Sequence, residues 1–176
     1  NTLGLPQYPH LSMSANGNAL VTWIQNGRVQ ARLYNASTHS WDSATSIPVL
    51  SSLTNGASNG AMGAINDAGR AVVTFTQYTT PPAKGPWNLL VNVFNGTTWQ
   101  TIPTNVDDTG LTAANNNGIY SQNIAIDANG NASVVWRQAE GTSLNAPYNI
   151  GYSRYTASSN TWSTASSTTI EAIADA

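Results

Sequence analysis

The sequence of 176 residues predicts an all-β fold built from three repeats of a four-stranded antiparallel sheet. Three observations lead to this prediction: one segment recurs three times without gaps, each repeat contains hairpin-turn sequences, and no stretch is long and periodic enough for a helix. A chain of this length suits one domain or one array of repeats.

The repeat is read from three aligned stretches, in each of which a glycine is followed six residues later by an aromatic residue. The stretches are MSANGNALVTW at 13–23, INDAGRAVVTF at 65–75 and IDANGNASVVW at 126–136. A second aromatic residue and a tryptophan follow downstream in each repeat: Tyr34 with Trp41, Phe94 with Trp99, and Tyr155 with Trp162. The three units therefore cover approximately residues 7–50, 57–105 and 117–170.

Four strands are expected in each unit, and the first unit shows why. A strand ending at Met13 leads into a turn at 15–18, where asparagine and glycine tolerate the positive φ of a tight hairpin. ALVTWIQ follows as the second strand, and Asn26-Gly27, a strong hairpin signal, joins it to RVQARLY. A polar loop leads to the fourth strand, expected from about Trp41 to Ile47.

The second strands of the later units, 71–75 and 132–136, carry apolar or small residues on both faces, which predicts burial on both sides. Four-stranded units of this size, each lying between neighbours, are what the blades of a β-propeller or a similar stacked array require. The array is thus predicted to be propeller-like.

Six repeated aromatic residues are assigned to packing. Trp23, Phe75 and Trp136 recur at one position among small alanine and valine residues, so we expect them to be buried between blades. Trp41, Trp99 and Trp162 recur near the outer strands, where an amphipathic ring is often half exposed. For this second set, one ligand-binding aromatic residue per blade is the alternative.

Composition argues against several classes of partner. Charged residues make up 8% of the chain, against roughly 25% in an average globular protein, and 60 of the 176 residues are Asn, Ser or Thr. The net charge is −2 and the six basic residues are scattered, so neither nucleic acid nor an anionic membrane is expected as a partner. No cofactor is expected. There is no cysteine, histidines are scarce, and no apolar run approaches the roughly 18 residues of a membrane span.

The sequence resembles the blade repeats of bacterial secreted or surface β-propellers, in which a D-x-x-G-N-A-x-V-x-W hairpin precedes a strand with tyrosine and asparagine and an outer strand with tryptophan. Residues 127–136, DANGNASVVW, carry this resemblance, whereas residues 66–75 place Arg70 and Phe75 where Asn and Trp stand elsewhere. A looser similarity exists to the Asp-box of sialidase-type propellers. The spacing between the glycine and the aromatic residue differs from that of the Asp-box, so we assign no sialidase catalytic residue to this chain.

Closed propellers typically have about four to eight blades, so three are too few to close a ring. The chain is therefore expected to be a partial array or a half-ring that self-associates. We expect its end faces, near Leu11 and Met13 at one end and Val134 and Ile150 at the other, to meet further blades. These would come from a second copy or from sequence outside this chain.

A candidate ligand site lies in the loops that vary most between repeats. Trp87 and Tyr148, with Lys84, Arg137 and Glu140 nearby, predict an aromatic platform with polar edges, which suits a sugar or a peptide. The alternative is that Trp87 only covers the rim of the blade.

A second candidate is a calcium loop at Asp127, Asn129 and Asn131, which place oxygen ligands at alternate positions. The glycine at 130 does not fit the EF-hand spacing, and an Asx-stabilised hairpin turn explains the same residues. No metal site is expected elsewhere.

The sequence contains no G-x-S-x-G elbow, phosphate loop or H-E-x-x-H helix, and Asp107-Asp108 has the character of a solvated loop. The predicted function is therefore a non-catalytic extracellular or cell-surface module that binds a glycan, a surface or copies of itself. One alternative is part of a glycosidase or lyase whose catalytic residues lie in other blades, and another is a structural subunit of a fibre or surface layer. A binding module is expected to repeat its pocket from blade to blade.

Overall fold

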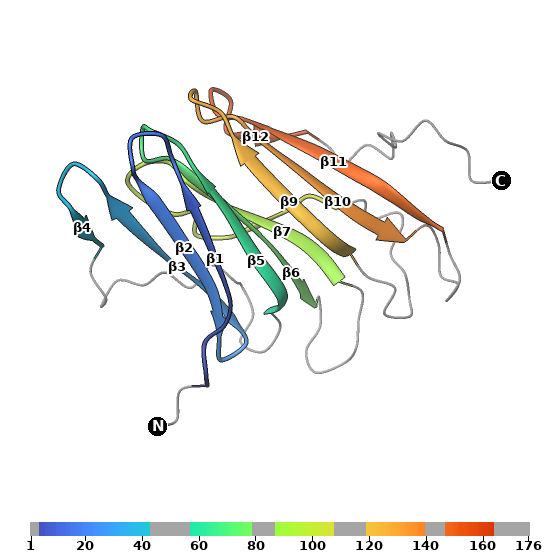
Figure 1. The fold of residues 1–176 in the computed structure, drawn as a ribbon. Coiled ribbons are helices and arrows are strands. Elements are labelled where there is room, and N and C mark those ends of the chain that lie inside the picture. The colour runs from blue at the N-terminus through green and yellow to red at the C-terminus, as the bar shows by residue number, and fades with distance from the viewer. Residues whose placement is uncertain (1–3, 43–56, 79–86, 108–118, 140–146, 164–176) are drawn as a thin grey trace.

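The computed structural model describes residues 4–42, 57–78, 87–107, 119–139 and 147–163, in which the chain forms three four-stranded antiparallel sheets and no helix (Figure 1). Blade 1 consists of β1 (Gln7–Met13), β2 (Ala19–Gln25), β3 (Arg28–Asn35) and β4 (Ser40–Trp41). Blade 2 consists of β5 (Ala57–Ile65), β6 (Ala71–Tyr78), β7 (Trp87–Phe94) and β8 (Thr104–Asn105). Blade 3 consists of β9 (Ile119–Ile126), β10 (Ala132–Ala139), β11 (Tyr148–Thr156) and β12 (Thr161–Trp162). The predicted fold class is thus confirmed.

The hairpin turns have the backbone geometry that the sequence predicts. Asn26 and Gly27 have φ values of 54° and 69°, the pair of positive values that a type I′ turn requires, and the flanking Gln25 and Arg28 are paired. In the turn before β2, Gly17 has a φ of 92°. Local turn chemistry therefore sets the register of both hairpins of blade 1.

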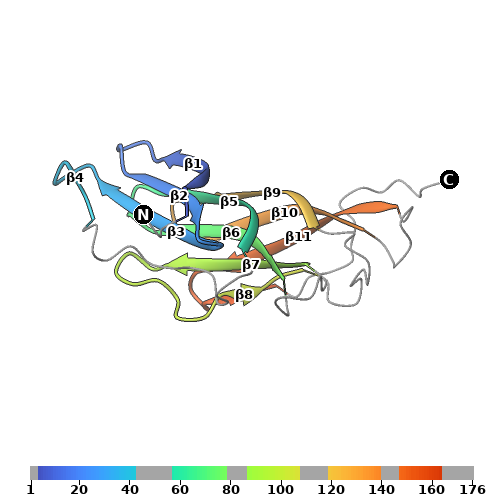
Figure 2. The same cartoon turned by 90° about the horizontal axis from the view of Figure 1, so that it is seen from below.

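The three blades stack face to face in chain order, and the first strand of each contacts the first strand of the next, β1 with β5 and β5 with β9 (Figures 1 and 2). We call the side of a blade that looks back along the chain its N-face and the other side its C-face. One apolar cluster fills each gap between blades, with Leu20 and Phe75 between blades 1 and 2, and Leu89 and Trp136 between blades 2 and 3.

The second strands show how the stacking determines burial. All side chains of β6 from Ala71 to Gln77 are buried, because blade 2 has a neighbour on both faces. In β10 the residues of the N-face are buried, whereas Val135 on the C-face is partly exposed and Arg137 is exposed. The prediction of burial on both sides is therefore confirmed for β6 and wrong for β10, since no described residues form a sheet over the C-face of blade 3.

Two predictions about the end faces change for the same reason. Val134 was expected at the open end of the array, but it is fully buried in the cluster between blades 2 and 3. Its neighbour Val135, paired with Tyr152, lies on the open side instead. Trp23 was expected to be buried like Phe75 and Trp136, but it is partly exposed, because it lies on the N-face of blade 1, which no described blade covers.

The outer aromatic residues form one pair per blade. Ring centroids are 5.3 Å apart for Tyr34 and Trp41, 5.2 Å for Phe94 and Trp99, and 5.3 Å for Tyr155 and Trp162. Trp99 and Trp162 pack against the apolar clusters, whereas Trp41 is 44% exposed. Each pair lies on the N-face of its blade, so only the pair of blade 1 lacks a preceding sheet among the described residues.

The first strand of each blade also carries a bulge that the sequence did not predict. Tyr8, Gly60 and Ser121 stand at equivalent positions, 52 and 61 residues apart, and have positive φ values of 53°, 50° and 54°. The strand register shifts at each of these positions. Three unrelated side chains share one backbone conformation, so the bulge belongs to the architecture of the blade. A helix that is long and apolar enough to cross a membrane is not found among the residues described.

Candidate functional site

A groove of about 800 Å³ opens between blades 1 and 2, where the turns that precede β2 and β6 lie. Its lining includes the apolar residues Leu33, Ile65 and Phe94. Phe94 is partly buried and packs against the apolar cluster between the two blades, which holds its ring in place. The groove thus has a fixed apolar part that a ligand can contact.

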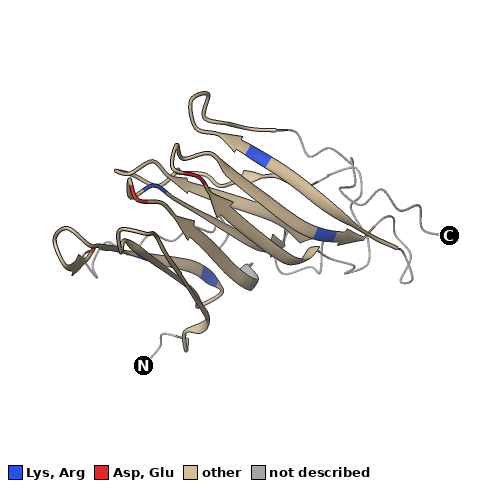
Figure 3. Ribbon diagram, turned by 45° about the horizontal axis from the view of Figure 1, so that its top comes forward, with Lys and Arg blue, Asp and Glu red and all other residues tan. Residues whose placement is uncertain are grey.

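Polar residues surround this apolar part. They carry amide, hydroxyl and carboxylate groups: Asn16, Asn18, Asn35, Ser37, Thr38, Ser40, Asp42 and Asp67. Among the described residues, no lysine or arginine lines the groove, consistent with the scattered charges of the ribbon in Figure 3. The lining therefore combines a large apolar ring with many neutral donors and acceptors.

One wall of the groove is built by hydrogen bonds between the turns of two blades. The amide of Asn16 donates to Asp67 Oδ1 at 2.8 Å, and the Asn16 side chain donates to the Asp67 carbonyl at 2.8 Å. Asn18 Nδ2 donates to the same carbonyl at 3.2 Å, while Asn18 Oδ1 accepts from the Ala36 amide at 3.0 Å. The three contacts with Asp67 join residues about fifty positions apart and fix the spacing of the blades, whereas the Asn18–Ala36 contact lies within blade 1.

A second part of the lining is the turn between β3 and β4, which the Asn18–Ala36 hydrogen bond joins to the first wall. Asn35 Oδ1 accepts from the amide and the hydroxyl of Ser37, at 2.9 and 2.6 Å. The hydroxyls of Thr38 and Ser40 are 2.8 Å apart. Beside them the Asp42 carboxylate forms an ion pair with Arg32 at 3.2 Å. The negative charge of Asp42 is therefore already paired within the protein. The hydroxyl groups of this turn are therefore ordered before any ligand binds.

The equivalent groove between blades 2 and 3 measures about 220 Å³. Val93, Ile126, Gly130 and Tyr155 line it at the positions that Leu33, Ile65, Gly69 and Phe94 occupy in the first groove. Arg70 stands where Asn18 stands in blade 1, and its guanidinium donates to the Asn129 carbonyl at 3.2 Å. A Cβ atom added at Gly130 would lie 2.9 Å from Arg70 Cδ. Arg70 thus lies across the second groove and narrows it.

Tyr155 contributes the aromatic ring of the narrower groove. Its hydroxyl donates to Asn160 Oδ1 at 2.7 Å. Burial raises the pKa of this phenol above its usual value, and the nearby Arg70 opposes the rise only in part. The ring therefore stays neutral and hydrogen-bonded at neutral pH.

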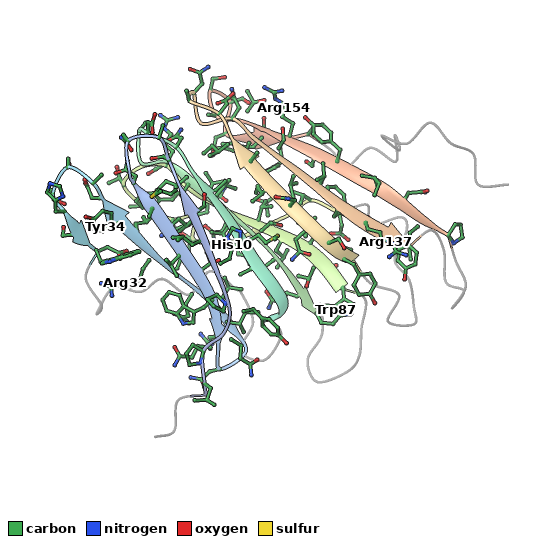
Figure 4. The ribbon with its side chains drawn as sticks, in the orientation of Figure 1. His10, Arg32, Tyr34, Trp87, Arg137 and Arg154 are labelled. Atoms are coloured by element: carbon green, nitrogen blue, oxygen red, sulfur yellow. The ribbon has the colours of Figure 1, made fainter. Side chains whose placement is uncertain are left out.

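The site predicted from the variable loops is only partly assembled. The Arg137 guanidinium lies 3.7 Å from the centroid of the Tyr148 ring, and the ring centroids of Tyr120 and Tyr148 are 6.1 Å apart. The strand pairing places all three on the C-face of blade 3, where Figure 4 labels Arg137. Trp87 lies on the same face of β7 as Leu89 and Val91, the C-face of blade 2 that looks towards blade 3, whereas Arg137 lies on the C-face of blade 3 itself. Lys84 and Glu140 lie outside the described residues.

The calcium candidate is a hydrogen-bonded turn. Asp127 Oδ1 accepts from the amides of Asn129 and Asn131 at 2.9 and 2.8 Å, and Oδ2 accepts from Asn131 Nδ2 at 2.9 Å. The Asn131 side-chain hydrogen bond is the main cause that lowers the pKa of Asp127. Asn131 Oδ1 accepts from the Ala157 amide. The side-chain oxygens of Asp127 and Asn131 thus accept hydrogen bonds from donors of the protein itself. In the described ranges, no three acidic or histidine side chains gather as a metal site.

The groove between blades 1 and 2 was not predicted from sequence. The signal that points to it is the asparagine at position 18 in blade 1 and at 131 in blade 3, in contrast to Arg70 in blade 2. The repeated turns mark where the walls begin, but only the stacking of blades brings them together.

No protein-family model matches this sequence, and no curated protein matches it. Among solved structures, the chain is similar to the polysaccharide lyase Uly1, with 13% identity and a TM-score of 0.52 over 89% of this chain and 40% of that one. It is also similar to the Hadza microbial sialidase Hz136, with 12% identity and a TM-score of 0.54 over 89% of this chain and 36% of that one. The chain spans about two fifths of the length of these structures. At such identities the likeness shows the fold, that of a propeller-like array of four-stranded blades.

Proposed function

We propose that this chain is a non-catalytic extracellular module of the β-propeller type that binds a neutral glycan in the groove between blades 1 and 2. The observation that supports it is the repetition of the groove at equivalent positions between consecutive blades, which is the behaviour expected of a binding module. The two similar structures are those of a polysaccharide lyase and a sialidase, which supports a carbohydrate ligand.

The chemistry of the lining suits a sugar. A pyranose presents C–H groups on its faces and hydroxyls at its edges, so it matches an aromatic ring surrounded by hydrogen-bonding groups. Phe94 supplies the ring, and Asn35, Ser37 and Thr38 supply ordered polar groups at the rim. Since the described part of the chain brings no basic side chain to the groove lining, a neutral sugar suits it better than an acidic one.

Blade 2 provides the variant for a test. Asn18→Arg places an arginine in the groove between blades 1 and 2, at the position from which Arg70 narrows the groove between blades 2 and 3. Arg70→Asn removes that arginine from the groove between blades 2 and 3. Binding of neutral glycans is screened on an array, and the affinity for the best ligand is then measured by calorimetry. We expect Asn18→Arg to abolish binding and Arg70→Asn to retain it.

Folding of both variants is checked by circular dichroism. Unchanged affinity in a folded Asn18→Arg protein would contradict the proposal, as would the absence of any glycan ligand for the unmodified chain.

A second candidate function is a share in a carbohydrate-active enzyme whose catalytic groups come from other blades. It is favoured by the bulges at Tyr8, Gly60 and Ser121, because bulges in strands are over-represented next to active sites. The two functions differ in their product. Release of shortened or unsaturated sugar from a bound glycan by a protein that contains these three blades supports the enzyme, whereas recovery of the intact glycan supports the binding module.

A further inference from the structure

The N-face of blade 1 has the same composition as the N-faces that are buried in blades 2 and 3. Its β2 residues are Ala19, Val21, Trp23 and Gln25, matched by Ala71, Val73, Phe75 and Gln77 in β6 and by Ala132, Val134, Trp136 and Gln138 in β10. Even the tryptophan hydrogen bond recurs: Nε1 donates to the glutamine two residues later at 3.3 Å from Trp23 and at 2.8 Å from Trp136.

In blades 2 and 3 this surface is covered by the C-face of the preceding blade. The cluster that covers Phe75 contains Leu20, Val29 and Ala31 from blade 1, all fully buried. The cluster around Trp136 likewise contains Leu89 and other aliphatic residues from blade 2. A covering C-face is thus uncharged and aliphatic where it meets the repeated aromatic residue.

No described residues form such a cover on blade 1. Leu11 and Met13, which share the N-face with Val21, are 63% and 69% exposed, and Trp41 is 44% exposed. Together with Trp23 they are the apolar side chains of the N-face, and Arg32, whose guanidinium lies 5.9 Å from the centroid of the Trp41 ring, lies among them. Several large apolar side chains exposed on one face mark an interaction site.

The C-face that this chain itself offers, that of blade 3, differs from the covering faces. Arg137 and Arg154 stand where blade 1 has Ile24 and Leu33, and Figure 4 shows them near opposite ends of the blade. The N-face of blade 1 carries Arg32, which is already paired with Asp42 at 3.2 Å, so a second copy stacked head to tail would bring two further arginines to a surface whose carboxylate is already paired. Burying an unpaired arginine costs much more than burying an aliphatic residue.

We infer that the N-face of blade 1 is the docking surface for a further blade of this repeat type, one whose C-face is aliphatic and uncharged at the positions of Leu20, Ile24 and Leu33. The two arginines of blade 3 exclude a second copy of this chain from that surface. The occupant is therefore another four-stranded sheet of the same architecture. Because of the two arginines, the N-face of blade 1 can accept a further blade of this kind, whereas the C-face of blade 3 does not dock on such an N-face.

The inference is tested by giving blade 3 the C-face of blade 1. In Arg137→Ile/Arg154→Leu, the chain offers an aliphatic C-face, and sedimentation velocity is expected to show a shift from monomer to larger species with rising concentration. Adding Val21→Arg on the N-face is expected to restore the monomer. The matched control Arg137→Lys/Arg154→Lys retains both charges and is expected to stay monomeric, like the unmodified chain.

Three results would overturn the inference. The first is a monomeric Arg137→Ile/Arg154→Leu protein, and the second is association that Val21→Arg leaves intact. The third is association of the unmodified chain that Val21→Arg abolishes, since its own copy would then be the occupant. If the isoleucine and leucine variant does not fold, Arg137→Thr/Arg154→Val, which carries the residues of blade 2 at these positions, replaces it.

Discussion

Trp23 and Trp136 occupy the same position in their blades and donate to the same kind of partner, yet Trp136 is 2% exposed and Trp23 is partly exposed. The difference arises from what lies in front of each ring. The C-face of blade 2 covers Trp136, whereas no described sheet covers Trp23. The environment of a repeated residue in a stacked array thus depends on its place in the array as well as on its own repeat.

Replacing Trp136 with alanine is expected to lower the free energy of unfolding by about 3–5 kcal/mol, because it removes a large ring from a packed core and leaves a cavity. Trp23→Ala is expected to lower it by less than half as much, since part of that ring is already in water. Urea denaturation of the two variants measures both values. Equal losses would show that the two rings are buried alike.

Gly151 on β11 is the pairing partner of Trp136 on β10, and the indole ring leaves no room for a side chain at position 151. A Cβ atom at Gly151 would lie 2.3 Å from Trp136 Cε2, a distance that forces the indole to move. Gly151→Ala is expected to lower the free energy of unfolding by about 1–3 kcal/mol and to alter the tryptophan signal in near-ultraviolet circular dichroism. Gln30 faces Trp23 at the equivalent place, so Gln30→Ala is the control and should have little effect.

The parts of the fold that depend only on residues adjacent in the sequence were predictable. Asn26-Gly27 determines its hairpin through its own φ preferences, and the prediction was confirmed. The bulge at Tyr8, Gly60 and Ser121 was not predictable, since the three side chains have nothing in common. The face on which Val134 lies was predicted wrongly because the composition of β10 is apolar on both sides. Its orientation follows only from the stacking of blade 3 on blade 2.

The candidate groove between blades 1 and 2 was likewise not predictable, because it depends on contacts between residues far apart in the sequence. Its wall depends on hydrogen bonds between Asn16 and Asp67, which lie 51 residues apart in the sequence. Each turn is recognisable alone as a hairpin, but neither turn indicates which other turn it meets. Composition did indicate the chemistry of the lining, because a chain rich in Asn, Ser and Thr presents amides and hydroxyls at its surface.

The Asp127 turn is expected to respond to acid. The hydrogen bond from the Asn131 side chain lowers the pKa of Asp127 below its ordinary value of 3.8. The carboxylate therefore stabilises the folded turn at pH values above the pKa that Asp127 has in the unfolded chain. This contribution is lost as the pH falls through the lower pKa of the folded state. Nuclear magnetic resonance titration of the Asp127 carboxyl carbon measures that pKa directly.

Asn131→Ala is expected to return the pKa of Asp127 towards 3.8, since it removes the main cause of the shift. Asn129→Ala is the matched control: only the backbone amide of Asn129 bonds to the carboxylate, so this substitution is expected to leave the pKa low. The same titration midpoint in Asn131→Ala as in the unmodified chain would show that another interaction lowers the pKa.

The contact between Asn16 and Asp67 is expected to couple blade 1 to blade 2. Asp67→Ala removes the acceptor of the Asn16 amide, and Asn16→Ala removes the donor that reaches the Asp67 carbonyl. Each substitution removes one of two separate hydrogen bonds, which contribute about 0.5–1.5 kcal/mol each, so each variant is expected to lose about that much free energy of unfolding in urea denaturation and the double variant the sum of the two losses. Both substitutions lie in exposed turns, so neither disturbs an apolar cluster. Ser37→Ala, in the turn between β3 and β4, should add independently to each. No loss of free energy of unfolding in Asn16→Ala or Asp67→Ala would mean that the apolar cluster alone holds the two blades together.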